Sequence, residues 1–221
     1  MDYHFNFSYI WRHFDRLWHG LILSLELALI SILIGMVIGL VLALLYTDGA
    51  RPVRNLVLAY VEIIRNVPLL LLVYLVFYGI PSIGGFEYSA TVSFIITLSA
   101  YAAAHLVEVF RAGLDAVPKG LLDAGKAIGL TPWQRLIHIR LPTMFRVVLP
   151  SLSNTYISLF KDTSVASVIA VPELTYGAQW INFNTFRIIE VYAVVAPMYL
   201  VTGYAILFAL QRLEHRFVVR R

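Results

Sequence analysis

The chain contains five long apolar stretches, and they limit its fold more than any other feature of the sequence. They cover about residues 21–46, 55–80, 89–111, 145–171 and 189–211. A helix rises about 1.5 Å per residue, so each stretch supplies the roughly 20 residues needed to cross a hydrocarbon layer about 30 Å thick. The sequence therefore predicts an all-α, polytopic membrane protein in which residues 1–221 form one membrane domain.

The composition supports this class. Hydrophobic residues make up 60% of the chain, charged residues only 14%, and the mean hydropathy is +0.78. A soluble domain carries about 25% charged residues, so this chain has too little polar surface for one. It contains no cysteine, which excludes disulfides, thiolate catalysis and cysteine-ligated metals, and no His or carboxylate cluster has the spacing of a metal site.

The basic residues predict an orientation. If the N-terminus is external, the external segments carry three bases, Arg12, Arg16 and Arg187, and the internal segments carry twelve. The twelve are Arg51, Arg54, Arg111, Lys119, Lys126, Arg135, Arg140, Arg146, Arg212, Arg216, Arg220 and Arg221. The positive-inside rule then places the N-terminus outside and the C-terminus inside. This distribution accounts for the pI near 9.4, so we expect no nucleic-acid partner.

One long polar segment, the 112–144 loop, interrupts the apolar sequence on the predicted cytoplasmic side. Pro118 suits the first turn of a helix over 118–128, and Gly129 suits the left-handed residue that ends it. Thr131 and Gln134 have the spacing of a capping box, which predicts a second helix toward Leu141 that Pro142 ends. The loop is therefore expected to fold as a helical hairpin.

Two interpretations of this hairpin remain open on these residues alone. It could lie as an amphipathic hairpin on the membrane surface. Alternatively, it forms a small projection, rimmed by bases such as Lys119, whose apolar face enters a groove on a cytoplasmic partner.

The loop resembles the signature loop of the membrane subunits of bacterial ATP-binding-cassette importers, whose pattern is E-A-A-x-x-x-G, nine residues, then I-x-L-P. The matching residues are Asp123, Ala124, Gly125, Gly129, Ile139, Leu141 and Pro142. Asp123 replaces the family's Glu, and Gly125 replaces its second Ala. The segments "EIIRNVPLLLLVYLVFYGIP" and "ISLFKDTSVASVIAVPEL" look like the polar amino acid branch of this type I importer family, and the likeness covers roughly residues 18–216.

The resemblance implies a set of partners. Such permeases pair with a second copy or a paralogue, dock their loops on two cytoplasmic ATPase subunits, and receive substrate from a periplasmic or surface binding protein. The chain has no G-x-x-x-x-G-K-[ST] loop of its own, so ATP and Mg²⁺ are expected on the partner ATPase and no cofactor on this chain.

A polar stripe runs along the fourth apolar stretch at three- and four-residue steps. Its members are Ser151, Asn154, Thr155, Ser158, Lys161 and Asp162. A charge at membrane depth is costly unless it is paired or hydrated, so the stripe cannot face lipid. It either holds neighbouring helices together or lines a substrate path, with Lys161 suited to a carboxylate and Asp162 to an ammonium group.

Two further pairs, Glu62 with Arg65 and Glu108 with Arg111, are three residues apart and are expected to form structural ion pairs.

The sequence as a whole predicts a permease of the bacterial inner membrane that imports polar amino acids or analogues such as opines. The alternative is a membrane enzyme acting on lipid or a buried peptide, with Lys161 and Asp162 catalytic.

Overall fold

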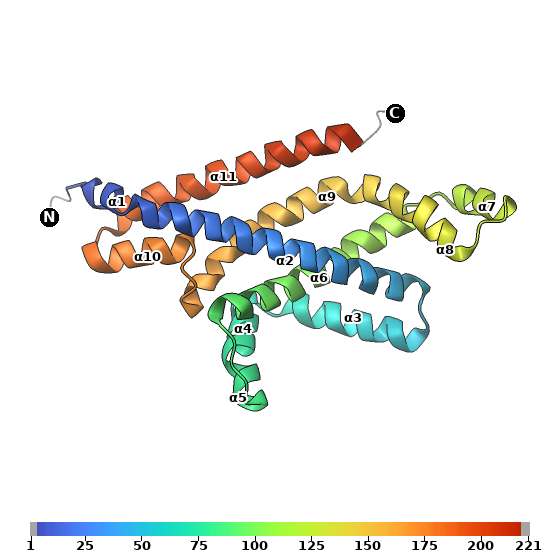
Figure 1. The fold of residues 1–221 in the computed structure, drawn as a ribbon, viewed down its shortest axis with the longest axis horizontal. Helices are drawn as coiled ribbons and strands as arrows, with labels where there is room; N and C mark the ends of the chain where they lie inside the picture. Colours follow the sequence, from blue (N-terminus) through green and yellow to red (C-terminus); the bar gives the residue numbers. More distant parts are fainter. Residues whose placement is uncertain (1–3, 218–221) are drawn as a thin grey trace.

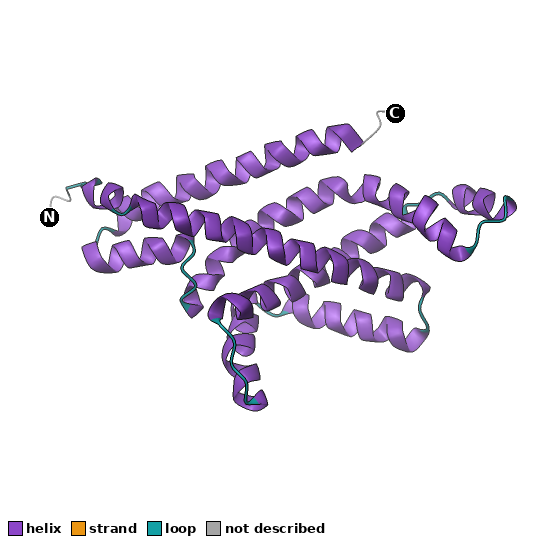
Figure 2. Cartoon of the chain, in the orientation of Figure 1, coloured by secondary structure: helices purple, strands orange, loops and turns teal. Residues whose placement is uncertain are grey.

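The computed structural model describes residues 4–217, with side chains to residue 212. Every regular element in this part is a helix, which confirms the all-α prediction (Figure 2). Arg220 and Arg221, and the side chain of Arg216, lie outside the described residues.

The elements follow one another with short connections (Figure 1). They are α1 (Ser8–Arg12), α2 (Phe14–Asp48), α3 (Arg51–Asn66), α4 (Leu69–Tyr74), the π-helical turn η1 (Leu75–Gly79), α5 (Ile80–Gly84), α6 (Ala90–Asp115), α7 (Lys119–Ala127), α8 (Pro132–Arg135), the π-helical turn η2 (Leu136–Arg140), α9 (Leu141–Asp162), the 3-10 helix η3 (Thr163–Ile169), α10 (Leu174–Thr185) and α11 (Ile188–Phe217).

Helices α2 and α6 form the centre of the bundle. They approach closely because glycines face the partner helix: a Cβ on Gly35 would lie 2.7 Å from the Cβ of Ala102, and one on Gly39 would lie 3.0 Å from the Cβ of Leu106. Small residues let membrane helices gain dispersion contacts that lipid cannot supply. This pair therefore fixes the frame on which the other helices pack.

Three helices of the described residues are long and apolar enough to cross a membrane: α2, α6 and α11 as far as Arg212. The predicted second stretch, 55–80, is not one straight helix. It breaks at Val67 and Pro68, where α3 and the segment 69–84 meet at 106°. Proline lacks the N–H of a regular helix and disfavours helical backbone in the residue before it, which accounts for the break.

The predicted fourth stretch, 145–171, corresponds to α9 followed by η3. The expectation that Pro142 ends the preceding helix is wrong, because α8, η2 and α9 run on as one helix from 132 to 162. The π-helical turn η2 ends two residues before Pro142. Its wider turn changes the hydrogen-bond register just where proline cannot donate, so the helix continues through it.

The bundle has two distinct ends (Figure 1). Helices α7 and α8 lie at one end, near the last turns of α2 and α6, whereas α1 and α10 lie at the other end with the N-terminus. The 112–144 loop and the N-terminus are thus far apart along the bundle, as the predicted orientation requires.

Candidate functional site: the loop and a polar cavity

The 112–144 loop folds as the predicted hairpin, with boundaries that differ slightly. Helix α6 continues to Asp115, Pro118 lies one residue before the first residue of α7, and Leu141 already belongs to α9. The loop proper is therefore residues 116–140.

The turn between α7 and α8 has the predicted chemistry. Gly129 has φ of +82°, the left-handed region, and the N–H of Leu130 bonds the carbonyl oxygen of Gly125 across 3.0 Å. The capping box is present: Gln134 N–H bonds Thr131 Oγ1 at 3.3 Å, and Thr131 N–H bonds Gln134 Oε1 at 2.9 Å. These bonds satisfy helix ends that would otherwise need water or a partner.

Gly125 has a packing role that its replacement of Ala did not suggest. It is buried, and a Cβ there would lie 2.6 Å from Cδ1 of Ile139. Glycine lowers the helix propensity of α7 by about 1 kcal/mol relative to alanine, but it allows α7 to approach η2 closely. Asp123 instead faces outward, where it pairs with Lys126 at 3.1 Å, and Ala124 is exposed.

The outer surface of this hairpin is apolar at several points. Leu121, Ile128 and Trp133 are 47%, 76% and 67% exposed. Exposed large apolar side chains on a compact projection, beside Lys119 and Lys126, are typical of a surface that enters a groove on another protein.

One ion pair joins the root of the hairpin to α2. Arg140 Nη1 lies 2.6 Å from Asp48 Oδ2, and among the polar contacts of the described residues it is the one that connects α2 with residues 116–140. Both side chains border a cavity of about 670 Å³, which also has Leu122 and Trp133 in its wall.

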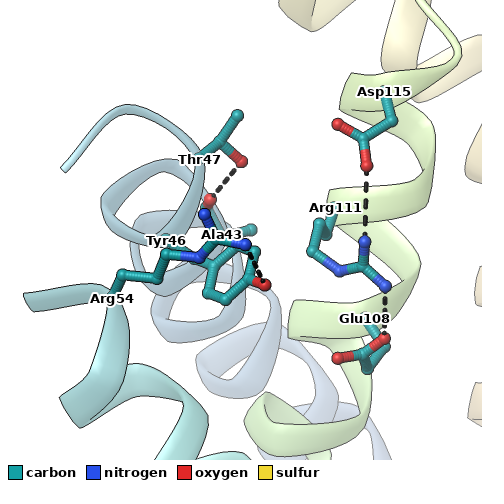
Figure 3. Close-up of polar contacts among 7 residues, drawn as sticks. All are labelled: Ala43, Tyr46, Thr47, Arg54, Glu108, Arg111 and Asp115. Atoms are coloured by element: carbon teal, nitrogen blue, oxygen red, sulfur yellow. Dashed lines mark hydrogen bonds and ion pairs between the residues drawn. The ribbon is translucent and has the colours of Figure 1, made fainter. Parts of the chain in front are cut away.

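Polar contacts also fix the neighbouring helix ends (Figure 3). Arg54 donates to the hydroxyl of Tyr46 across 3.0 Å, and Arg111 pairs with Glu108 at 2.9 Å and with Asp115 at 3.4 Å. The predicted pair of Glu108 and Arg111 is confirmed.

The structure gathers four members of the polar stripe around one cavity of about 410 Å³, the polar cavity. They are Asn154, Thr155, Ser158 and Asp162. Thr155 donates its hydroxyl to the carbonyl oxygen of Ser151 at 2.9 Å, so its oxygen keeps acceptor capacity toward the cavity. Asp162, at the end of α9, is half-buried.

Two residues of α6 complete the polar cavity and were not predicted as site residues. Tyr101 and His105 lie one turn apart, with ring centroids 4.6 Å from each other. The buried Nε2 atom of His105 has no hydrogen-bond partner among the described residues. Arg65 of α3 lies within electrostatic range of both rings. The predicted ion pair of Glu62 and Arg65 is absent from the described residues, because Glu62 accepts a hydrogen bond from Asn66 at 3.1 Å instead.

Lys161 does not reach the polar cavity. Adjacent helical residues differ by about 100° in direction, and Lys161 points into a separate groove of about 530 Å³ between α9 and α11. We call this the Lys161 groove; its remaining wall consists of Ile157, Ser164, Ala196, Tyr199, Leu200, Gly203, Tyr204 and Leu207.

At the opposite end, Glu173 connects three helices. Its carboxylate caps α10 by accepting N–H bonds from Thr175 at 2.9 Å and Tyr176 at 2.8 Å, and it accepts from Ser24 of α2 at 3.3 Å and Tyr199 of α11 at 3.1 Å. Burial raises the pKa of Glu173 to about 7, although these hydrogen bonds act in the opposite direction. Glu173 is therefore a structural centre at the end of the bundle remote from the loop.

Apolar helices long enough to cross a membrane, a projecting capped hairpin and a polar cavity between the helices are together typical of a membrane transport subunit. Residues 20–219 match the family described as the binding-protein-dependent transport system inner membrane component, and the chain belongs to this family. It is a multi-pass transport subunit of the inner membrane. ATP hydrolysis lies on a partner subunit, and the transporter also includes a substrate-binding protein.

Individual relatives agree with this assignment. The chain is 31% identical over 216 residues to the glutamine transport system permease protein GlnP of Escherichia coli (strain K12), covering 97% of this chain and 99% of the relative. It is 38% identical over 201 residues to the L-cystine transport system permease protein TcyB of Bacillus subtilis (strain 168), covering 89% and 82%. A crystal structure of an amino acid ABC transporter with histidines superposes with a TM-score of 0.88 at 28% identity, covering 97% of this chain and 100% of that one.

Proposed function

We propose that this permease imports polar amino acids or close analogues such as opines, and that the substrate passes through the polar cavity. The observation that carries the proposal is the set of groups gathered there: the carboxylate of Asp162, the amide and hydroxyls of Asn154, Thr155 and Ser158, and Nε2 of His105, which has no hydrogen-bond partner within residues 4–212. A cavity of about 410 Å³ falls within the range of small-molecule sites, about 300 to 1,000 Å³.

The charges suit a zwitterion. Asp162 offers an acceptor for the substrate's ammonium group, and Arg65 of α3, which is not in the cavity wall, lies within electrostatic range of Tyr101 and His105. This arrangement moves the carboxylate-binding role from Lys161, where the sequence suggested it, to Arg65. A charge-assisted hydrogen bond to Asp162, together with the positive field of Arg65, would offset the hydration that the substrate loses on entry.

The exposed apolar face of the 112–144 loop is proposed to dock on the ATPase, which binds ATP and Mg²⁺. The loop residues proposed for ATPase coupling are Pro118, Lys119, Asp123, Ala124, Gly125, Gly129, Ile139, Leu141 and Pro142; Gly125 is buried against Ile139, so it would act by holding the hairpin together rather than by touching the ATPase. Because α8, η2 and α9 form one helix, a displacement of the loop would reach the polar cavity as a rigid-body movement. The complete transporter is proposed to contain two permease subunits, two ATPase subunits and an external binding protein.

The relatives give no support to the alternative, a membrane enzyme with Lys161 and Asp162 catalytic. The two side chains also border different cavities, which does not favour a shared catalytic role.

Co-purification and uptake test the proposal together. A tagged permease expressed with its ATPase should retain the ATPase, and the complex in proteoliposomes should take up a polar amino acid only with ATP and the binding protein present. A permease that binds no ATPase, or a complex that transports none of the polar amino acids, would contradict it.

A further inference from the structure

Glu26 and Lys161 are two opposite charges within the apolar helices that have no hydrogen-bond or ion-pair partner among the described residues; Asp162 and Arg65, at or near the polar cavity, share this property. Glu26 is exposed in the middle of α2, and Lys161 is exposed in the Lys161 groove. Neither side chain takes part in the polar contacts of this part of the chain. An ionised group facing lipid is unfavourable, so Glu26 requires a counter-charge from outside the chain or a shift to its neutral form, whereas the charge of Lys161 also acts on the adjacent Asp162.

The two charges lie in the sequence beside members of one buried cluster that joins α2 and α9. Phe160, the neighbour of Lys161, belongs to the same buried cluster as Leu21 and Ala28 of α2, and Glu26 lies between these two residues in the sequence. Two copies related by a two-fold axis along the membrane normal keep each residue at the same depth. Glu26 of one copy can then meet Lys161 of the other, and the symmetry forms the pair twice.

The surfaces around the charges are also complementary. The face of α2 that carries Glu26 presents Ile22, Leu29 and Leu33, which are 38%, 49% and 54% exposed. The Lys161 groove is mostly apolar, and a methyl group added at Gly203 in its wall would meet no atom within 4 Å, which leaves room for a helix to approach. Almost none of the apolar part of α11 is buried within the chain, whereas more than half of that of α6 is.

We propose that the Lys161 groove receives α2 of a second copy of this chain, and that the partner's Glu26 pairs with Lys161 there. The proposal rests on the paired permease arrangement of the proposed importer and names the residues that hold it together. It assigns Lys161 to assembly rather than to the substrate.

Cysteine cross-linking tests this contact, since the chain has no cysteine of its own. The permease tested carries both Glu26→Cys and Lys161→Cys and is assembled in the complete complex. A short bifunctional thiol reagent should convert most of this permease into covalently linked dimers. Leu33→Cys with Lys161→Cys is the matched control. Leu33 lies on the same face of α2 but seven residues, or about 10 Å, nearer the loop end, so this pair should link at least tenfold less.

Charge reversal provides a second arm that does not depend on cysteines. Glu26→Lys and Lys161→Glu should each lower the fraction of dimeric permease severalfold, because each places like charges together, and the double variant should recover it. Equal linking of the Leu33 control contradicts the proposal, as does failure of the double reversal to recover dimers. Absence of Glu26 to Lys161 linking in a complex that still imports substrate would refute this contact while leaving the importer function intact.

Discussion

Arg140 reaches back across 92 residues of sequence to Asp48, with 2.6 Å between Nη1 and Oδ2. Asp48 is the last residue of α2, where the negative end of the helix dipole disfavours a carboxylate, and no basic residue lies in that last turn. The guanidinium of Arg140 supplies the missing positive charge. The root of the 112–144 loop is thereby tied to the helix that carries Glu26 and packs along α6.

This tie predicts that Asp48→Asn weakens coupling more than stability. An exposed ion pair contributes only about 0.2 to 1 kcal/mol, and Asp48 is half-exposed, so thermal unfolding should change little. Substrate-stimulated ATP hydrolysis should fall severalfold, because the loop loses its fixed direction relative to α2. The double reversal Asp48→Arg with Arg140→Asp should restore it.

The matched control for this prediction is Asp115→Asn. Asp115 is also an ion-paired acid at the end of a long helix, but its partner Arg111 lies on the same helix and not in the loop. A loss of coupling in this control as large as in Asp48→Asn would assign the effect to general surface charge.

The left-handed turn gives a second prediction. Gly129→Leu should uncouple hydrolysis from uptake, since a β-carbon is disfavoured at a φ of +82° by about 1 to 2 kcal/mol, while a Cβ there meets no atom within 4 Å. Gly129→Asn should retain most activity, because Asn adopts this conformation more readily. We expect both proteins to assemble in the membrane; uptake by the Leu variant equal to wild type would remove the turn from the coupling mechanism.

Glu173 predicts a dependence of stability on pH. Its pKa in the folded chain, about 7, lies above the ordinary value of 4.5, so the folded state holds the proton more tightly. Stability from this group is complete below about pH 4.5 and is lost as the pH rises through 7, by at most about 1.4 kcal/mol per unit.

Thermal unfolding of the solubilised protein at several pH values should show this loss between about pH 5 and 8. Glu173→Gln cannot ionise, so its unfolding temperature should vary less over the same range. Parallel curves for the two proteins would show that another group is responsible.

The orientation is tested by labelling. A single cysteine at Thr131, in the exposed turn of the loop, should react with a membrane-impermeant thiol reagent only after the cells are opened. A cysteine at Tyr9, which is 41% exposed near the opposite end, should react in intact cells. The reverse pattern would place the N-terminus in the cytoplasm.

Local features of this fold could be predicted from the sequence because they depend on neighbouring residues. The capping box of Thr131 and Gln134, the left-handed Gly129 and the apolar helices α2, α6 and α11 belong to this group. The prediction for Pro142 is wrong because a π-helical turn that ends two residues earlier changes the local hydrogen-bond register.

The candidate site was only partly predictable for a different reason. The periodicity of the sequence placed Asp162 and Lys161 on one stripe. A stripe this wide borders two cavities, and the packing of α6 and α11 decides that Asp162 lines the polar cavity and Lys161 lines the Lys161 groove. His105 and Arg65 contribute from helices distant in sequence. The one available signal was a histidine and an arginine within apolar stretches, and it did not indicate that His105 lines the cavity or that Arg65 lies within electrostatic range of it.

The central claim is that substrate passes through the polar cavity and not beside Lys161. Uptake by purified, reconstituted complexes carrying Asp162→Asn or Lys161→Met, measured against substrate concentration and normalised to assembled complex, compares two adjacent residues directly. The account predicts that Asp162→Asn lowers apparent affinity roughly tenfold to a hundredfold, the value of one charge-assisted hydrogen bond, whereas assembled Lys161→Met retains wild-type affinity. Wild-type affinity in Asp162→Asn together with a large loss in assembled Lys161→Met would contradict it.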